Sequence, residues 1–152
     1  MVVTRGSREG DFVIEEPRRG LLRNHPMQYA VRSEGIVSSA GFFGAAKTEF
    51  SPPFVDLPAR LEAGATWTWE GSSKGARMEI RSVFVGLETV KVAAGEFRCA
   101  RVERHMPQVP AHVTVHWYAE GVGLVKMQSK RPAAIVVPES RLSLALTAFV
   151  VK

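Results

Sequence analysis

Apolar and polar residues alternate along most of the chain with a period of two residues. Near the end, residues 141–150 place Leu142, Leu144 and Leu146 on one face of an extended segment, and residues 112–118 alternate in the same way. A period of two is typical of a β-strand with one buried face, whereas an amphipathic helix repeats every three to four residues. Helical spacing is nearly absent, so the sequence predicts an all-β protein with little helix.

One long extended stretch, residues 76–92, changes the parity of its apolar side chains. Met78 and Ile80 have one parity, and the apolar residues from Val83 onward have the other. A change of parity within a strand is the signature of an inserted residue that transfers the apolar side chains to the other face. We therefore predict a β-bulge or a bend near Ser82.

Short segments rich in glycine, proline and serine separate the predicted strands. They comprise residues 72–75, 93–95, 107–110 and 120–123. Each has the chemistry of a tight turn, and residues 93–95 fit a three-residue hairpin loop with Gly95 in the left-handed conformation. Strands at this spacing, joined by short turns, predict an antiparallel meander.

The first third of the chain is less regular. We expect a hairpin of residues 27–32 and 35–39, a strand at 47–50, an extended proline-rich connection at 51–58 and one helical turn within 57–64. The length of 152 residues suits one domain. We expect residues 1–10 to be a flexible tail and residues 11–152 to form a single β domain.

A sheet with so little helix to cover it must bury its apolar face by closing on itself, against a second layer, or against a ligand. We therefore expect a strongly curved antiparallel sheet that forms an open or incomplete barrel. Its interior would hold the large apolar side chains Trp67, Trp69, Phe84, Phe97, Val115, Trp117, Leu144 and Leu146. Two interpretations remain open at this point, a filled core and a groove for an apolar ligand. In the second, the ligand-binding residues are Trp67, Trp69, Phe84, Phe97, Val115 and Trp117.

Composition and charge exclude several classes. Hydrophobic residues make up 45% and charged residues 23%, as in soluble globular proteins, and no apolar run reaches the length of a transmembrane segment. The net charge is +5, but basic residues alternate with acidic ones and no nucleic-acid-binding motif is present, so we expect no nucleic-acid partner. The first ten residues lack the apolar stretch of a secretion signal.

The titratable residues do not form a recognisable catalytic or metal-binding pattern. His112 and His116 lie four apart on a predicted strand, roughly 13 Å, too far to share one ion. His105 and His112 would face each other across a turn, but a third ligand is not evident. Cys99 is the only cysteine, and its alternation with Phe97 predicts a buried small hydrophobe. We expect no metal, no cofactor and no enzymatic activity.

Three segments together resemble a known group of proteins. They read GATWTW at residues 64–69, VGLETVKVAAGEF at 85–97 and WYAEGVGLVK at 117–126. This order resembles small bacterial envelope proteins and lipoproteins of unassigned function, which are similar to the lipoprotein-carrier superfamily. The resemblance implies an incomplete antiparallel barrel around an apolar cavity and a place in the cell envelope or periplasm. It implies no catalytic residues.

Three functional hypotheses follow. The leading one is a non-enzymatic binding module that holds an apolar or amphipathic ligand, lipid-like or a lipoprotein segment, in the concave face of the sheet. It predicts that Trp67→Ala and Trp117→Ala weaken binding more than they change the fold. The second is a structural or accessory subunit of an envelope assembly, which binds a protein partner through its sheet edges or proline-rich loop. The third is an enzyme that uses glutamates such as Glu88 and Glu103, or the pair His105 and His112.

Overall fold

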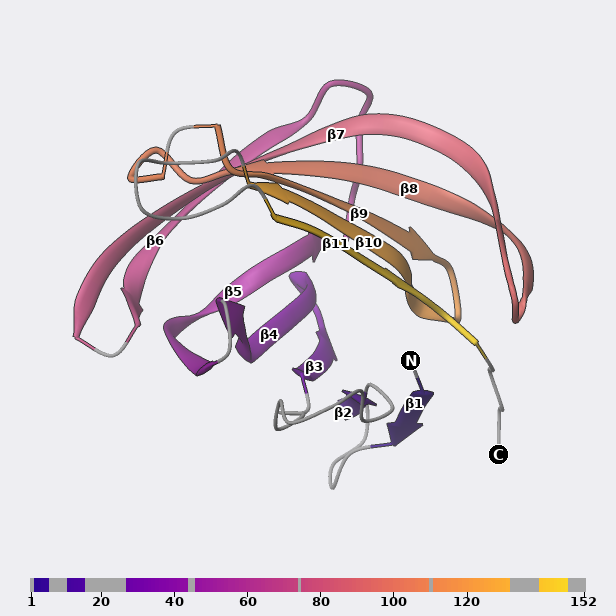
Figure 1. The fold of residues 1–152 in the computed structure, drawn as a ribbon, viewed down its shortest axis with the longest axis horizontal. Coiled ribbons are helices and arrows are strands. Elements are labelled where there is room, and N and C mark those ends of the chain that lie inside the picture. Colours follow the sequence, from indigo (N-terminus) through magenta and orange to yellow (C-terminus); the bar gives the residue numbers. More distant parts are fainter. Residues whose placement is uncertain are drawn as a thin grey trace. The chain divides into compact units, whose positions relative to one another are not determined.

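The structure is a computed structural model that describes residues 2–5, 11–15, 27–43, 46–73, 75–109, 111–131 and 140–147. Within these residues every regular element is a strand and none is a helix, and the strands follow one another in chain order as antiparallel neighbours (Figure 1). The strands are β1 (Val2–Arg5), β2 (Asp11–Glu15), β3 (Met27–Arg32), β4 (Gly35–Phe43), β5 (Ala46–Pro58), β6 (Thr66–Ser73), β7 (Ala76–Val92), β8 (Gly95–His105), β9 (Val113–Ala119), β10 (Gly123–Arg131) and β11 (Ser140–Ala145). The predicted all-β meander is confirmed.

The chain divides into two compact units. Unit 1 comprises Met1–Leu61, Trp69–Met78 and Val150–Lys152, and unit 2 comprises Glu62–Thr68 and Glu79–Phe149. Unit 1 therefore contains β1 to β5, whereas unit 2 contains most of β7 and all of β8 to β11. The expectation of one domain over residues 11–152 stays a prediction.

Unit 1 contains the hairpin expected around Ser33 and Glu34, because Arg32 pairs with Gly35 at the ends of β3 and β4. Two details of the N-terminal third differ from expectation. Within the expected tail, Val2–Arg5 pair with β2 as a strand. The proline-rich residues 51–58 belong to β5 itself.

The expected helical turn within residues 57–64 is wrong. Strand β5 continues to Pro58, and two bends and a tight turn follow it. In that turn the backbone N–H of Ala65 donates to the carbonyl oxygen of Glu62 at 2.9 Å. The segment is too short, and too close to prolines, for helix formation to offset its nucleation cost.

Unit 2 is built on the long β7–β8 hairpin. Its turn has two residues, Ala93 and Ala94, because Gly95 pairs with Val92 as the first residue of β8. The predicted three-residue loop is therefore shorter by one. The predicted bulge exists, but the register shifts between Phe84 and Gly86 instead of near Ser82.

The sheet of unit 2 curls strongly at the end where the β7–β8 and β9–β10 turns lie (Figure 1). Val90 of β7 belongs to the same packed cluster as Val125 of β10, although three strand spacings would separate them by roughly 14 Å in a flat sheet. At the same end, the N–H of Ala94 donates to the carbonyl oxygen of Leu146 at 3.3 Å, which joins the hairpin turn to the segment after β11. Unit 2 is thus an open half-barrel, as the sequence predicted.

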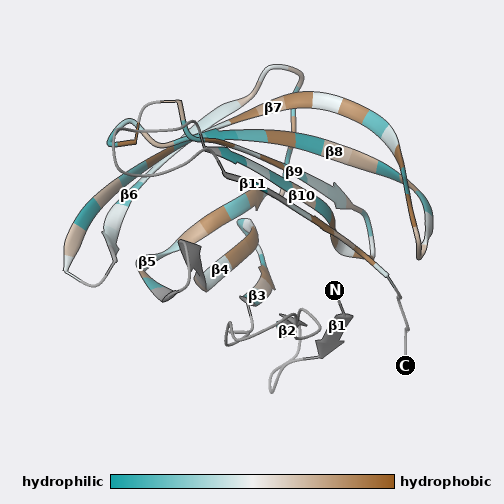
Figure 2. Ribbon diagram, in the orientation of Figure 1, coloured by the Kyte–Doolittle hydropathy of each residue, from teal (hydrophilic) through white to brown (hydrophobic). Residues whose placement is uncertain are grey.

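The register of unit 2 defines two faces of its sheet. Arg101, Trp117 and Lys126 are cross-strand neighbours on β8, β9 and β10, so their side chains share one face, which we call the Trp117 face. Ala100 and Tyr118 are neighbours on the opposite face, which we call the Tyr118 face. Figure 2 shows the resulting alternation of hydrophilic and hydrophobic residues along β7 and β8. Because Val90, Trp117 and Val125 meet across the curl, the Trp117 face is concave at this end.

Candidate binding face of unit 2

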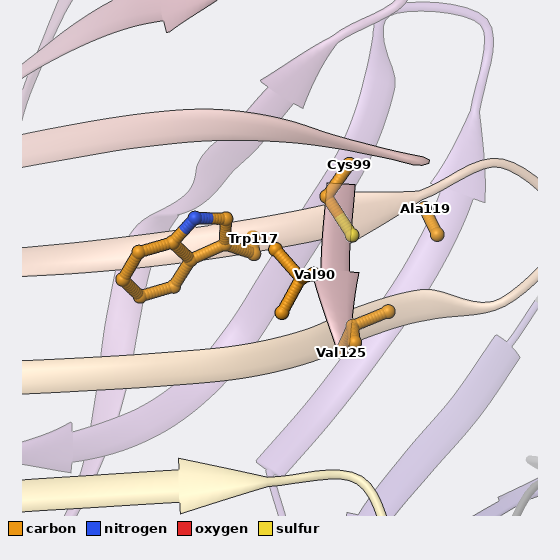
Figure 3. Close-up of a cluster of buried hydrophobic side chains, with 5 residues drawn as sticks. All are labelled: Val90, Cys99, Trp117, Ala119 and Val125. Atoms are coloured by element: carbon orange, nitrogen blue, oxygen red, sulfur yellow. The ribbon is translucent and has the colours of Figure 1, made fainter. Parts of the chain in front are cut away.

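The end of the Trp117 face near the β7–β8 turn is apolar. Its buried cluster consists of Val90, Cys99, Trp117, Ala119 and Val125 (Figure 3). Four partly buried side chains pack against the cluster: Val92, Phe97, Val115 and Val122. The first group is the core of the curl, and the second presents apolar surface to the outside. Burying one such large side chain stabilises a fold by about 1.5–3 kcal/mol.

Trp117 is held on two sides by charged groups. Its indole N–H donates a hydrogen bond to a carboxylate oxygen of Glu88. The ammonium group of Lys126 lies 4.9 Å from the centre of the indole ring, within the range of a cation–π interaction. With 6% of its surface exposed, Trp117 is mainly a core residue, and only its neighbours can contact a ligand directly.

Charged residues follow the apolar cluster along β7 and β8. The guanidinium of Arg101 lies 2.6 Å from a carboxylate oxygen of Glu103 and 4.0 Å from one of Glu88. All three side chains are about one-third exposed or more, so solvent screens these ion pairs and each contributes little to stability. Their geometric effect is larger, because Arg101 holds both carboxylates on the β7–β8 side of the face.

Within the described strands β9, β10 and β11, the charged side chains on this face are all cations. Strands β9, β10 and β11 contain no aspartate or glutamate, and Lys126, Lys130 and Arg141 lie on the Trp117 face. Lys130 and Arg141 are direct cross-strand neighbours. The Trp117 face of unit 2 is therefore apolar and concave at the curled end, zwitterionic on β7–β8, and lined by cations of β10 and β11 toward its other end.

The structure brings together three of the six predicted ligand-binding residues, Phe97, Val115 and Trp117. Phe84 lies on the opposite face. It pairs with Val102, and Val102 pairs with His116, which precedes Trp117 on β9 and therefore points to the other side of the sheet. Phe84 is buried, as expected of an interior residue, but it does not line one surface together with Trp117. The physical reason is the register: the bulge after Phe84 shifts the parity of β7, so Val90 and not Phe84 points with Trp117.

The other residues that were predicted to face the interior do not belong to the Trp117 cluster. Trp69 lies in unit 1, where its ring centre is 5.4 Å from that of Phe50 and 5.8 Å from that of Phe54, both edge-to-face. Trp67 belongs to unit 2 and is half-buried. Leu146 is fully buried. Leu144 pairs with Met127 on the Tyr118 face, so it too lies opposite Trp117, contrary to expectation.

The Tyr118 face holds a buried polar cluster that the sequence pattern did not predict. A guanidinium nitrogen of Arg104 donates to the hydroxyl of Tyr118 at 2.8 Å, and another lies 3.3 Å from Nε2 of His116. The rings of His116 and Tyr118 are stacked, with centres 6.1 Å apart. Burial, and secondarily the positive charge of Arg104, lowers the pKa of His116 well below its usual value. One signal was available in the sequence, since Arg104 has the same parity as the buried Val102.

Two further expectations concern the thiol and the other histidines. Cys99 is fully buried, as predicted, and its thiol donates to the carbonyl oxygen of Phe97 at 3.5 Å. Burial, assisted by the charge of Glu88, raises the pKa of Cys99 to about 11. His112 is 2.9 Å from the hydroxyl of Ser129, whereas His116 contacts Arg104. In the described part of the chain, no three histidine, cysteine or acidic side chains are placed to hold a metal ion.

Comparisons with protein-family models, with curated proteins and with solved structures found no significant match. The resemblance to the lipoprotein-carrier superfamily therefore stays a prediction from three sequence segments. In the described ranges, the structure contains no helix long and apolar enough to cross a membrane.

Proposed function

We propose that unit 2 binds an amphipathic ligand on its Trp117 face, at the curled and concave end of the sheet. The observation that supports this proposal is the division of that one face into an apolar end and a charged end. A ligand with an apolar part and a polar group matches both surfaces at once, whereas a wholly apolar ligand would cover only the first. Small-molecule sites are mostly apolar with a few placed polar groups, which is the composition found on this face.

The contacts of the ligand follow from burial. The five buried residues of the cluster form the core under the site. The partly exposed Phe97 and Val115, which pack against this core, supply the surface that contacts the ligand. Trp117, which is held by Glu88 and Lys126, belongs to the core against which Phe97 and Val115 pack. The ligand therefore contacts the side chains that pack against Trp117, and Trp117 itself supports them as part of the core.

A direct test compares two apolar residues of unit 2. Phe97 packs against the core of the curl, whereas Leu87 is 57% exposed and lies on the Tyr118 face. Displacement of a neutral fluorescent probe by 1-decanol measures binding to wild type, Phe97→Ala and Leu87→Ala. We expect Phe97→Ala to weaken binding about tenfold, the equivalent of about 1.4 kcal/mol, and Leu87→Ala to leave it unchanged. Absence of saturable binding to wild type would refute the proposal.

A second candidate function rests on the outer edge of β7. The hairpin partner β6 begins at Thr66, and the N–H of Phe84 donates to Ala65 at 2.8 Å, so β6 does not extend beside residues 85–92. On that stretch Val85 and Leu87 are 49% and 57% exposed. An exposed apolar edge of this kind can pair with another strand. In this second candidate function, two copies of the chain pair through this edge of β7.

Sedimentation velocity over a range of protein concentrations tests this second candidate. Association that is abolished by Leu87→Lys, but not by a substitution at the exposed Glu96 on the neighbouring strand, would support pairing through the edge. A protein that stays monomeric at all concentrations would refute this second candidate function. The expectation that the chain is not an enzyme stays a prediction, and so does its expected place in the cell envelope.

A further inference from the structure

The outer edge of β7 carries a regular set of hydrogen-bonding groups where the strand continues beyond β6 (Figure 1). Val92 and Gly95 close the two-residue turn of the β7–β8 hairpin, so the N–H and C=O of Val92 face β8. Along an antiparallel strand these groups point to alternate sides. The register therefore directs the N–H and C=O of Leu87, Thr89 and Lys91 away from β8. Among the described strands, β7 has only β6 and β8 as neighbours, and β6 does not reach this stretch.

The same edge of a second copy of the chain is complementary to this set. Directly opposed residues of antiparallel strands have their side chains on the same face of the sheet. A two-fold axis that relates two copies must therefore pass at a residue and not between two residues. With the axis at Thr89, each Thr89 is opposite the other, and Leu87 is opposite Lys91 of the second copy. Each of these three residues then exchanges both of its hydrogen bonds with the second copy.

The two neighbouring registers are less favourable. With the axis at Glu88, the carboxylates of the two Glu88 side chains are directly opposed, and like charges in this position destabilise a pair of strands. With the axis at Val90, Leu87 is opposite Ala93, which belongs to the turn and not to the strand. With the axis at Thr89, no like charges are opposed within residues 86–92, and two threonines form a favourable cross-strand pair.

The axis at Thr89 also covers the most exposed apolar side chain of this edge. Leu87 is 57% exposed, and in this register it contacts the methylene groups of Lys91 of the second copy. On the Trp117 face, Glu88 of one copy is opposite Val90 of the other. Because the axis is perpendicular to the sheet, the Trp117 faces of both copies lie on the same side and adjoin each other.

We infer that two copies of this chain join their β7 strands into an antiparallel pair centred on Thr89, so that their sheets become continuous. The inference rests on the second candidate function and adds the register of the pair. It also joins the two candidate binding faces into one surface, with the apolar clusters of both copies on the same side of the combined sheet.

A first experiment tests the backbone hydrogen bonds by sedimentation velocity. Thr89→Pro removes an N–H that points to the edge and leaves the hydrogen bonds to β8 intact, and edge strands tolerate proline at such positions. We expect association at least about tenfold weaker than that of wild type, because both copies lose a hydrogen bond. Thr89→Val retains the N–H and the branched side chain, so it should associate like wild type.

A second experiment tests the register through charge at position 87. Leu87→Lys places a like charge opposite Lys91 of the second copy, whereas Leu87→Glu places an opposite charge there. We expect Leu87→Glu to associate at least about tenfold more tightly than Leu87→Lys at an ionic strength of about 0.01 M, and the difference to decrease at about 0.15 M. Lys91→Gln, added to either variant, should remove most of the difference. Val109→Lys and Val109→Glu are the control, since Val109 is exposed outside the strands, and they should associate equally.

The outcomes separate the inference from the second candidate function. Equal association of Leu87→Lys and Leu87→Glu, or full association of Thr89→Pro, would overturn the register and retain pairing through this edge. A wild-type protein that stays monomeric at all concentrations would refute both. The substituted residues are exposed, so the variants should unfold at the urea concentration of wild type, which circular dichroism checks. If Thr89→Pro does not fold, the two Leu87 variants decide the register by themselves.

Discussion

Replacing Trp117 by alanine should destabilise unit 2 severely. The indole is the largest side chain of the buried cluster, is 6% exposed, and packs with valines of β7 and β10 that meet only because the sheet curls. Removing a buried tryptophan from a core costs about 3–5 kcal/mol through lost burial and the remaining cavity. The carboxylate of Glu88 would also lose the N–H donor of Trp117.

Trp117→Phe separates these contributions. Phenylalanine keeps most of the apolar ring and removes the N–H, so we expect a cost of about 1.5–3 kcal/mol, the range for a hydrogen bond to a charged group. In combination with Glu88→Gln the cost should be less than the sum of the two single costs, since both variants disturb one contact.

Urea unfolding followed by far-ultraviolet circular dichroism measures these costs, because that signal does not depend on the tryptophan that is removed. Leu87→Ala is the reference, with an expected change within about 0.5 kcal/mol for an exposed residue. A cost below about 1 kcal/mol for Trp117→Ala would refute the reasoning. It would show that the ring is not part of the core and would restore the hypothesis that it contacts a ligand directly.

Three further predictions concern single residues. The pKa of His116 is lowered by burial, so protonation favours the unfolded state, and the free energy of unfolding should fall as the pH drops below about 6.5, by at most about 1.4 kcal/mol per pH unit. Urea unfolding between pH 4 and 8 measures this dependence. His116→Gln should remove it, whereas His105→Gln, at an exposed site, should not. Cys99, with a pKa of about 11 and no exposed surface, should react with Ellman's reagent only after unfolding, and rapid reaction in the native protein would contradict its placement. Gly35→Ala should destabilise unit 1 by more than about 1 kcal/mol, because its φ is +132° and an added Cβ would clash with the carbonyl oxygen of Leu57; an unchanged thermal unfolding midpoint would count against this geometry.

The sequence was sufficient to predict the architecture, since that depends on local chemistry. Alternation in residues 76–92 and 112–118 predicted strands, and the residues 120–123 predicted the β9–β10 turn. In the structure, Gly121 and Gly123 of that turn both have positive φ. These properties depend on residues close together in the chain, whose conformational preferences act before any tertiary contact forms.

The candidate site depended on contacts between distant residues. Alternation shows which side chains share a face within one strand, but the register between strands decides which faces coincide, and it placed Phe84 opposite Trp117. The opposition of Lys130 and Arg141 likewise follows from the pairing of β10 with β11. Only the curl of the sheet brings Val90 of β7 against Val125 of β10. A period of two residues contains no information on that curvature, because twist and bulges accumulate over the whole sheet.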